Sequence, residues 1–106
     1  MQISRLVEVV ELTVPFSNHE ELLFRIEILS QGRGGSMRYL CRLYRLESFR
    51  FKALSNSNGS RIKWVNADYR SWVVDDNLGL ETKSYKSASI ARREAIATLK
   101  QQLGLG

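Results

Sequence analysis

The sequence predicts an α+β domain, an antiparallel meander of four or five strands with one C-terminal helix packed on one face. Two observations predict this fold. Before residue 75, hydrophobic and polar residues alternate over long stretches separated by glycine- and asparagine-rich turns, which is typical of strands and hairpins. Residues 87–103 instead repeat small and hydrophobic residues at helical spacing. A chain of 106 residues, 43% of them hydrophobic, is sufficient for one domain with its own core, spanning 1–106.

The first strand is predicted at 3–14, "ISRLVEVVELTV", because this stretch is rich in β-branched residues. It is expected to end at Pro15, which has no backbone N–H to donate to a neighbouring strand. The alternation is imperfect. It predicts four residues on one side, namely Leu6, Val10, Leu12 and Val14.

The second strand is predicted at 21–30, where the alternation is clean. One side carries Leu22, Phe24, Ile26 and Ile28. The other carries Leu23, Arg25, Glu27 and Leu29. The following "QGRGGS" predicts a hairpin loop, since glycine adopts the positive φ angles that such loops need.

The stretch 37–54 fits two interpretations. Arg38, Arg42 and Arg45 lie at helical spacing, but the helical pattern fails at "FRFK". A period of two holds throughout, so we predict a long strand with a bend or bulge near Glu47 and Ser48.

Turn signals divide the region that follows. Asn58-Gly59 predicts a type I′ hairpin turn. The stretches 61–65 and 69–74 both favour strand, and the polar residues 66–68 between them indicate either a bulge in one strand or a turn between two. Asp75 and Asp76 are expected to lie in a turn that closes the β-rich part.

The helix at 87–103 has one small, apolar face, which consists of Ala88, Ala91, Ala95, Ile96, Leu99 and Leu103. Ser87 or Ser89 is expected to cap its start, and Gly104 to end it. Alanines at the centre of this face allow the helix axis to approach a sheet closely. Arg92 intrudes on the face and is expected to extend its guanidinium group to water.

Charge selects the register between the strands predicted at 21–30 and 37–54. Pairing Gly32 with Met37 sets oppositely charged or apolar residues across from one another: Glu27 with Arg42, Arg25 with Tyr44, Leu29 with Leu40, and Leu23 with Leu46. A shift by two residues places Arg25 against Arg42, a like-charge pair that is unfavourable across strands. We therefore predict the first register.

This register turns an apolar spine and several cations toward the side opposite the helix. The spine consists of Leu23, Leu29, Leu40, Tyr44 and Leu46. The residues predicted to form a binding face are Leu23, Arg38, Leu40, Arg42, Tyr44, Leu46, Arg50 and Lys52. A fully hydrated sheet face would carry threonine, serine or lysine at most of the leucine positions.

The formal net charge of +5 is concentrated in the middle of the chain. Residues 1–32 hold two cations and five anions, residues 33–70 nine cations and two anions, and residues 71–106 five cations and four anions. This asymmetry indicates an anionic partner, or an acidic strand that lies beside a basic one.

Three interpretations of the predicted face remain open. It could bind a protein partner or form a homodimer, with arginines at the rim. It could bind single-stranded nucleic acid or RNA, with Tyr44, Trp64 or Trp72 stacking on bases. Residues 1–14 or 75–86 could also fold over the spine and leave the arginines paired with the N-terminal glutamates. We favour the protein interface.

The sequence contains no complete constellation for catalysis, so we expect a non-enzymatic domain without metal or cofactor. His19 is the only histidine, and the only cysteine, Cys41, is expected to point into the core. No stretch is apolar enough to span a bilayer, and the N-terminal segment is unlike a signal peptide. A cytoplasmic location is therefore expected.

The stretches "CRLYRLESFRF", "ADYRSWVVDD" and "SASIARREAIATL" together resemble a group of small proteins of unknown role from cyanobacterial genomes. The resemblance covers about residues 37–100 and consists of strand and helix patterning. It implies an α+β domain, favours the strand at 37–54, and assigns no site residues.

Overall fold

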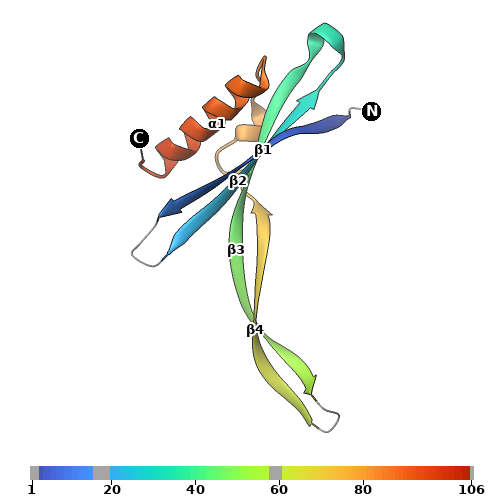
Figure 1. The fold of residues 1–106 in the computed structure, drawn as a ribbon, viewed down its shortest axis with the longest axis vertical. Coiled ribbons are helices and arrows are strands. Elements are labelled where there is room, and N and C mark those ends of the chain that lie inside the picture. Colours follow the sequence, from blue (N-terminus) through green and yellow to red (C-terminus); the bar gives the residue numbers. More distant parts are fainter. Residues whose placement is uncertain (1–2, 16–19, 58–60, 106) are drawn as a thin grey trace.

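The structure, a computed structural model, describes residues 3–15, 20–57 and 61–105, with side chains described outside 53–57, 61–63 and 65. It confirms the predicted α+β fold (Figure 1). Four antiparallel strands form one sheet in the order β1-β2-β3-β4. The strands are β1 (Ser4–Pro15), β2 (Glu21–Gln31), β3 (Arg38–Ser57) and β4 (Arg61–Val74). Two short 3₁₀ helices, η1 (Gly34–Ser36) and η2 (Leu80–Thr82), lie in the connections, and α1 (Ala88–Gln102) follows.

The core lies between α1 and one side of the sheet, where the helix contacts β2 and β3. Its buried hydrophobic residues are Phe24, Ile26, Ile28, Cys41, Leu43, Leu80, Ala91, Ala95 and Leu99. Ala91 and Ala95 have no exposed surface, which confirms that small residues bring the helix close to the sheet. The Cys41 thiol donates a hydrogen bond to the Ala91 carbonyl oxygen at 3.3 Å, so the prediction that Cys41 points into the core is also confirmed.

Helix α1 begins and ends as its sequence predicts. The Ser87 hydroxyl accepts a hydrogen bond from the Ile90 N–H at 3.2 Å and caps the first turn. Gly104 has a φ angle of 72° just beyond the helix. Arg92 remains partly exposed, but its guanidinium group binds the Glu8 carboxylate of β1 at 2.7 Å rather than water alone.

The predicted register of β2 with β3 is confirmed. Glu27 lies opposite Arg42, Arg25 opposite Tyr44, and Leu29 opposite Leu40. Pairing of β2 with β3 ends at Phe24 and Arg45, so the expected pair of Leu23 with Leu46 lies just beyond the hydrogen-bonded ladder. Gly32 in the connecting loop has a φ angle of 113°, and a Cβ atom there would lie 2.6 Å from the Ser36 carbonyl oxygen. Glycine is therefore required at this position.

The structure corrects three local predictions. The alternation in β1 is interrupted by a register shift between Leu6 and Glu8, so Leu6 lies opposite Leu29, on the other side of the sheet from Val10, Leu12 and Val14. Of the bend or bulge predicted in β3 near Glu47 and Ser48, the bulge is absent, since pairing with β4 continues there without a shift, whereas the strand does curve (Figure 1).

The third correction concerns residues 66–68, which neither bulge nor turn but continue one strand, β4. Asp68 lies opposite Arg50, and their side chains form an ion pair at 3.2 Å. This cross-strand pair explains why a polar triplet remains in a strand. The predicted turn at Asn58-Gly59 and the predicted loop position of His19 lie outside the described residues.

Candidate interface on the open face of the sheet

The side of the sheet opposite α1, here called the open face, carries the residues that alternate with the core residues. In β2 and β3 these include Leu23, Arg25, Glu27, Leu29, Leu40, Arg42, Tyr44 and Leu46. Strand β4 adds Trp72 opposite Leu46 and Val74 opposite Tyr44. Strand β1 lies beside β2 in the same sheet, and Leu80 of η2 packs into the core on the helix side. Within the described residues, therefore, neither segment folds over the open face.

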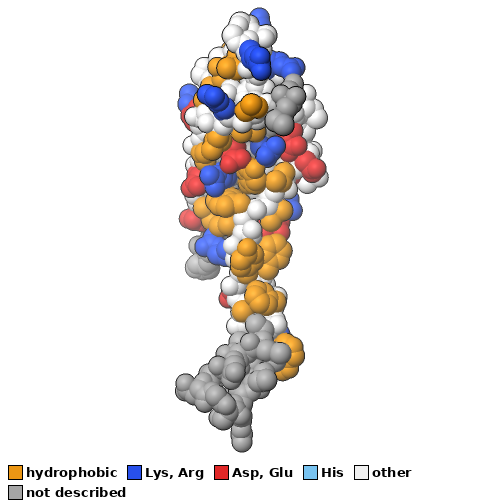
Figure 2. Space-filling view, turned by 90° about the vertical axis from the view of Figure 1, so that its right-hand side faces the viewer, with side chains coloured by type: hydrophobic (Ala, Val, Ile, Leu, Met, Phe, Trp, Pro, Cys, Tyr) orange, Lys and Arg blue, Asp and Glu red, His pale blue; other side chains and the backbone are white. Residues whose placement is uncertain are grey.

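The apolar spine on this face is half-buried rather than sealed. Leu23, Leu29, Leu40, Tyr44 and Leu46 all have intermediate exposure, as does Trp72. Figure 2 shows hydrophobic side chains running along this side of the molecule, with positive and negative side chains interspersed among them. The side chains pack against one another in the plane of the sheet, but no second layer of the described chain covers them.

Most cations on the part of the open face that β1, β2 and β3 form have an acidic neighbour. Glu27 lies opposite Arg42, and Glu11 lies opposite Arg25. Arg25 also approaches Glu27 at 3.9 Å within its own strand. The hydroxyl of Tyr44 beside Arg42, together with the nearby carboxylates Glu81 and Glu27, raises the pKa of the Arg42 guanidinium above its ordinary value. The face is thus apolar with nearly balanced charge.

The predicted binding residues divide into two groups. Leu23, Leu40, Arg42, Tyr44 and Leu46 lie together where β3 runs beside β2 or just beyond that pairing, and Arg38 stands exposed at the start of β3. Arg50 and Lys52 point to the same side but lie further along β3, where only β4 accompanies it. Arg50 is paired with Asp68, whereas Lys52 lies opposite Asn66.

A shallow pocket of about 140 Å³ lies at the border of the open face, where β4 no longer accompanies β3. It is lined by Leu29, Gln31, Leu40, Cys41, Arg42 and Glu81. Burial raises the pKa of the Cys41 thiol to about 11, so this group is neutral at physiological pH and is not an activated nucleophile. No group of three or more His, Cys, Asp and Glu side chains suited to a metal ion occurs in the described parts of the chain.

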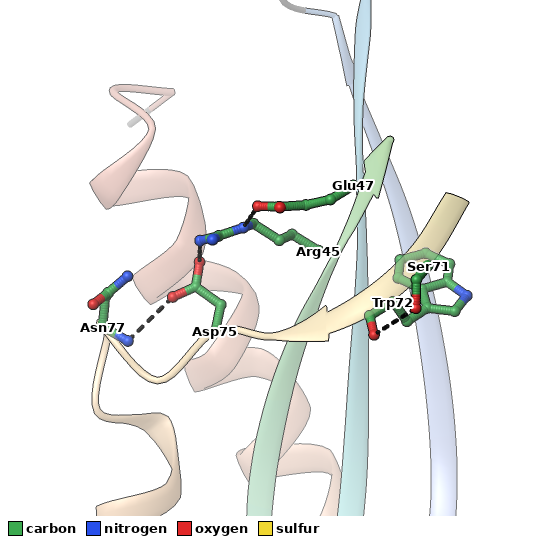
Figure 3. A network of polar contacts seen from close by, with 6 residues as sticks. All are labelled: Arg45, Glu47, Ser71, Trp72, Asp75 and Asn77. Atoms are coloured by element: carbon green, nitrogen blue, oxygen red, sulfur yellow. Dashed lines mark hydrogen bonds and ion pairs between the residues drawn. The ribbon is translucent and has the colours of Figure 1, made fainter. Parts of the chain in front are cut away.

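A polar network on the helix side of the sheet explains the two charged residues that interrupt the apolar side of β3 (Figure 3). The Arg45 guanidinium group bonds to the Glu47 carboxylate and, at 3.1 Å, to Asp75. The other oxygen of Asp75 accepts a hydrogen bond from the Asn77 N–H, also at 3.1 Å. Asp75 thus acts in the turn after β4, as predicted, and the network connects β3 to the chain that leads to η2.

Sequence reasoning missed the contribution of β4 to the open face. The sequence indicated Trp72 only as a residue that could stack on nucleic-acid bases, and it did not place Val74, which is 47% exposed, on this face. The register of β3 with β4 could have assigned Trp72 and Val74 to the open face. A prediction of the connecting turn alone does not determine this register.

Comparisons with known proteins add no relative. No protein family, curated protein or solved structure matches the chain. Within the described residues, no helix is long and apolar enough to cross a membrane.

Proposed function

We propose that this chain is a non-catalytic interaction domain whose open face binds a protein surface, either on a partner or on a second copy. One observation supports this proposal above the others. The apolar spine and Trp72 form an apolar strip on the side opposite α1, which the pair of Arg42 and Glu27 crosses, and no described element lies over it.

The balance of charge favours a protein over a nucleic acid at this strip. A protein interface combines an apolar centre with a polar rim. A nucleic-acid site needs cations that are free to neutralise phosphates. Here Arg25 and Arg42 lie opposite Glu11 and Glu27, so the strip presents little net positive charge.

Leu40→Glu tests the proposal, because it places a charge in the spine opposite Leu29. We expect this variant to lose at least about 90% of the complex that the wild-type chain forms in its source cells through cross-links from its open face, since a buried unpaired charge costs several kcal/mol at an interface. Leu105→Glu is the matched control, because Leu105 is 54% exposed near the C-terminus, away from the spine. Circular dichroism should show both variants folded. Equal complex formation by Leu40→Glu and wild type would refute the proposal.

The second candidate is binding of single-stranded nucleic acid, and it rests on a different part of the surface. Trp64 is 67% exposed, while Arg38, Lys52 and Arg70 lie opposite the uncharged residues Gln31, Asn66 and Ser48. About four phosphate contacts would give a slope near −3 when the logarithm of affinity is plotted against that of salt concentration. Such a slope with single-stranded RNA or DNA would support this candidate, and absence of binding at low salt would remove it.

A further inference from the structure

Strands β3 and β4 extend far beyond the rest of the sheet. After the last β2–β3 pair, Phe24 with Arg45, β3 pairs only with β4. The resulting two-stranded ribbon, here called the arm, runs from the pair Glu47–Ser71 to the pair Ser57–Arg61. Figure 1 shows it projecting away from α1 and from the other strands, and the molecule measures 65 × 40 × 19 Å.

The two faces of the arm differ sharply. One, here called the aromatic face, carries Phe49, Phe51, Ala67 and Tyr69. Phe49, Phe51 and Tyr69 are 43%, 48% and 56% exposed, and the rings of Phe49 and Tyr69 pack at a centroid distance of 6.4 Å. The opposite face carries polar and charged residues, namely Ser48, Arg50, Lys52, Asn66, Asp68 and Arg70, and further out it also carries the exposed Trp64. Such alternation is typical of a sheet with one buried side, yet no described part of this chain lies against the aromatic face.

The surface of the chain is too large for a compact monomer. A folded chain of 12.2 kDa exposes about 6,000 Å², whereas this one exposes 8182 Å². Its radius of gyration is 19.0 Å, and about 13 Å is expected for this length. The excess of roughly 2,000 Å² exceeds the roughly 800 Å² per partner that a stable interface of standard size buries. An isolated two-stranded hairpin is at best marginally stable in water, so the arm is expected to acquire a second layer.

The chemistry of the aromatic face suits a second copy of the same face. Its aromatic residues and Ala67 carry no charge, and Glu47 at its base is already bound to Arg45. Over the part of the arm whose side chains are described, two copies related by a two-fold axis would therefore meet without burying an unpaired charge or opposing like charges. Arg50, Lys52 and Arg70 would remain in water on the outer sides of the paired arms.

We propose that the arm packs through its aromatic face against the arm of a second copy. The two chains then form a two-fold symmetric dimer, in which each arm supplies one two-stranded layer. The aromatic face continues the helix-covered side of β3, so it lies on the side of the sheet opposite to the open face. The dimer and the proposed function therefore use different surfaces, and either can fail alone.

Light scattering of the purified full chain tests the dimer. The wild type should show twice the 12.2 kDa mass of one chain. Phe51→Glu should raise the dissociation constant by at least about 100-fold and give monomers, because an aromatic anchor is replaced by a buried charge. Lys52→Glu, the neighbouring residue on the polar face, is the matched control and should stay dimeric, as should Leu40→Glu on the open face.

Each alternative outcome is decisive. A wild-type chain that remains monomeric at all concentrations, or a Phe51→Glu variant that is folded and still dimeric, would overturn the arm dimer. Monomers from Leu40→Glu but not from Phe51→Glu would also overturn it and would show instead that copies associate through the open face.

A second measurement needs no variant and so does not depend on the folding of Phe51→Glu. In a mixture of isotope-labelled and unlabelled wild-type chains, isotope-filtered nuclear Overhauser spectra should show contacts between copies from the Phe49, Phe51 and Tyr69 rings. A dimer in which these rings contact only their own chain would contradict the proposal.

Discussion

At the scale of single residues, the positions that break the alternation of β3 are the ones that make specific contacts. Arg45 and Glu47 interrupt the apolar side of the strand, and they bond to each other and, through Arg45, to Asp75. A period-two pattern predicts that odd positions of this strand face the helix, and Cys41 and Leu43 confirm it. It does not reveal a partner 30 residues away, because that contact depends on the course of the chain after β4.

The Cys41 thiol provides a prediction about pH. Burial raises its pKa from 9.0 to about 11, so the folded state holds this proton more tightly than the unfolded chain does. The resulting stabilisation is fully present below pH 9 and is lost as the pH rises toward 11. Over this range the free energy of unfolding of the wild type should fall more steeply than that of Cys41→Ala, by up to about 1.4 kcal/mol per pH unit.

Urea unfolding of both proteins at several alkaline pH values measures this difference. Cys41→Ala serves as the control because all other titrating groups are common to the two chains. Parallel pH dependences would show that the thiol ionises as easily in the folded as in the unfolded protein.

At the scale of elements, a clear hydrophobic period predicted the type and bounds of an element well, whereas an ambiguous period did not. The helix predicted at 87–103 is α1 at Ala88–Gln102, because its small and apolar residues fit only one face. In β1, Leu6 fits the same alternation as Val10, Leu12 and Val14, so the register shift between Leu6 and Glu8 leaves no trace in the pattern. The residues that this shift moves to the open face therefore could not be assigned from the sequence.

The register of β3 with β4 illustrates the same limit for the candidate site. A two-residue turn at Asn58-Gly59 would pair Ser57 with Ser60, whereas Ser57 pairs with Arg61. A slip of one residue moves every side chain of a strand to the other face. It would place Ser71 rather than Trp72 beside Leu46, so this part of the open face became visible only in the structure.

Helix α1 provides a prediction based on its close approach to the sheet. Ala95→Leu should lower the free energy of unfolding by about 1–3 kcal/mol, because Ala95 is fully buried and a larger side chain must displace its neighbours. Ala97→Leu on the exposed side of the same helix is the control and should change stability little, since leucine and alanine have similar helix propensities. Chemical denaturation of the two variants and the wild type measures these differences in the free energy of unfolding. Equal stabilities would mean that α1 can shift away from the sheet without cost.

At the scale of the whole molecule, the structure consists of a small packed body and an arm that contributes none of the buried residues among those described. All of the buried core residues come from β2, the first part of β3, η2 and α1. The sequence predicted the strands of the arm but not its projection, because alternation shows which way side chains point and not whether a second layer lies beneath them.

Removal of the arm tests this division. We expect a chain in which Asn-Gly joins Ser48 directly to Arg70 to retain cooperative unfolding, because the core is intact. Its radius of gyration should fall from 19.0 Å to about 12 Å, the value for a compact chain of the remaining length. Small-angle X-ray scattering and urea unfolding measure both properties. Loss of cooperative unfolding would show that the arm is needed for the body to fold.

The irregularity in β1 has a consequence for solubility. As the outermost strand on its side of the sheet, β1 presents backbone N–H and C=O groups that could template the addition of a foreign strand and start a fibril. At the register shift near Val7 the spacing of these groups departs from that of a regular strand. An added strand therefore could not form a continuous row of backbone hydrogen bonds there. The irregularity in β1 thereby disfavours aggregation through this edge of the sheet.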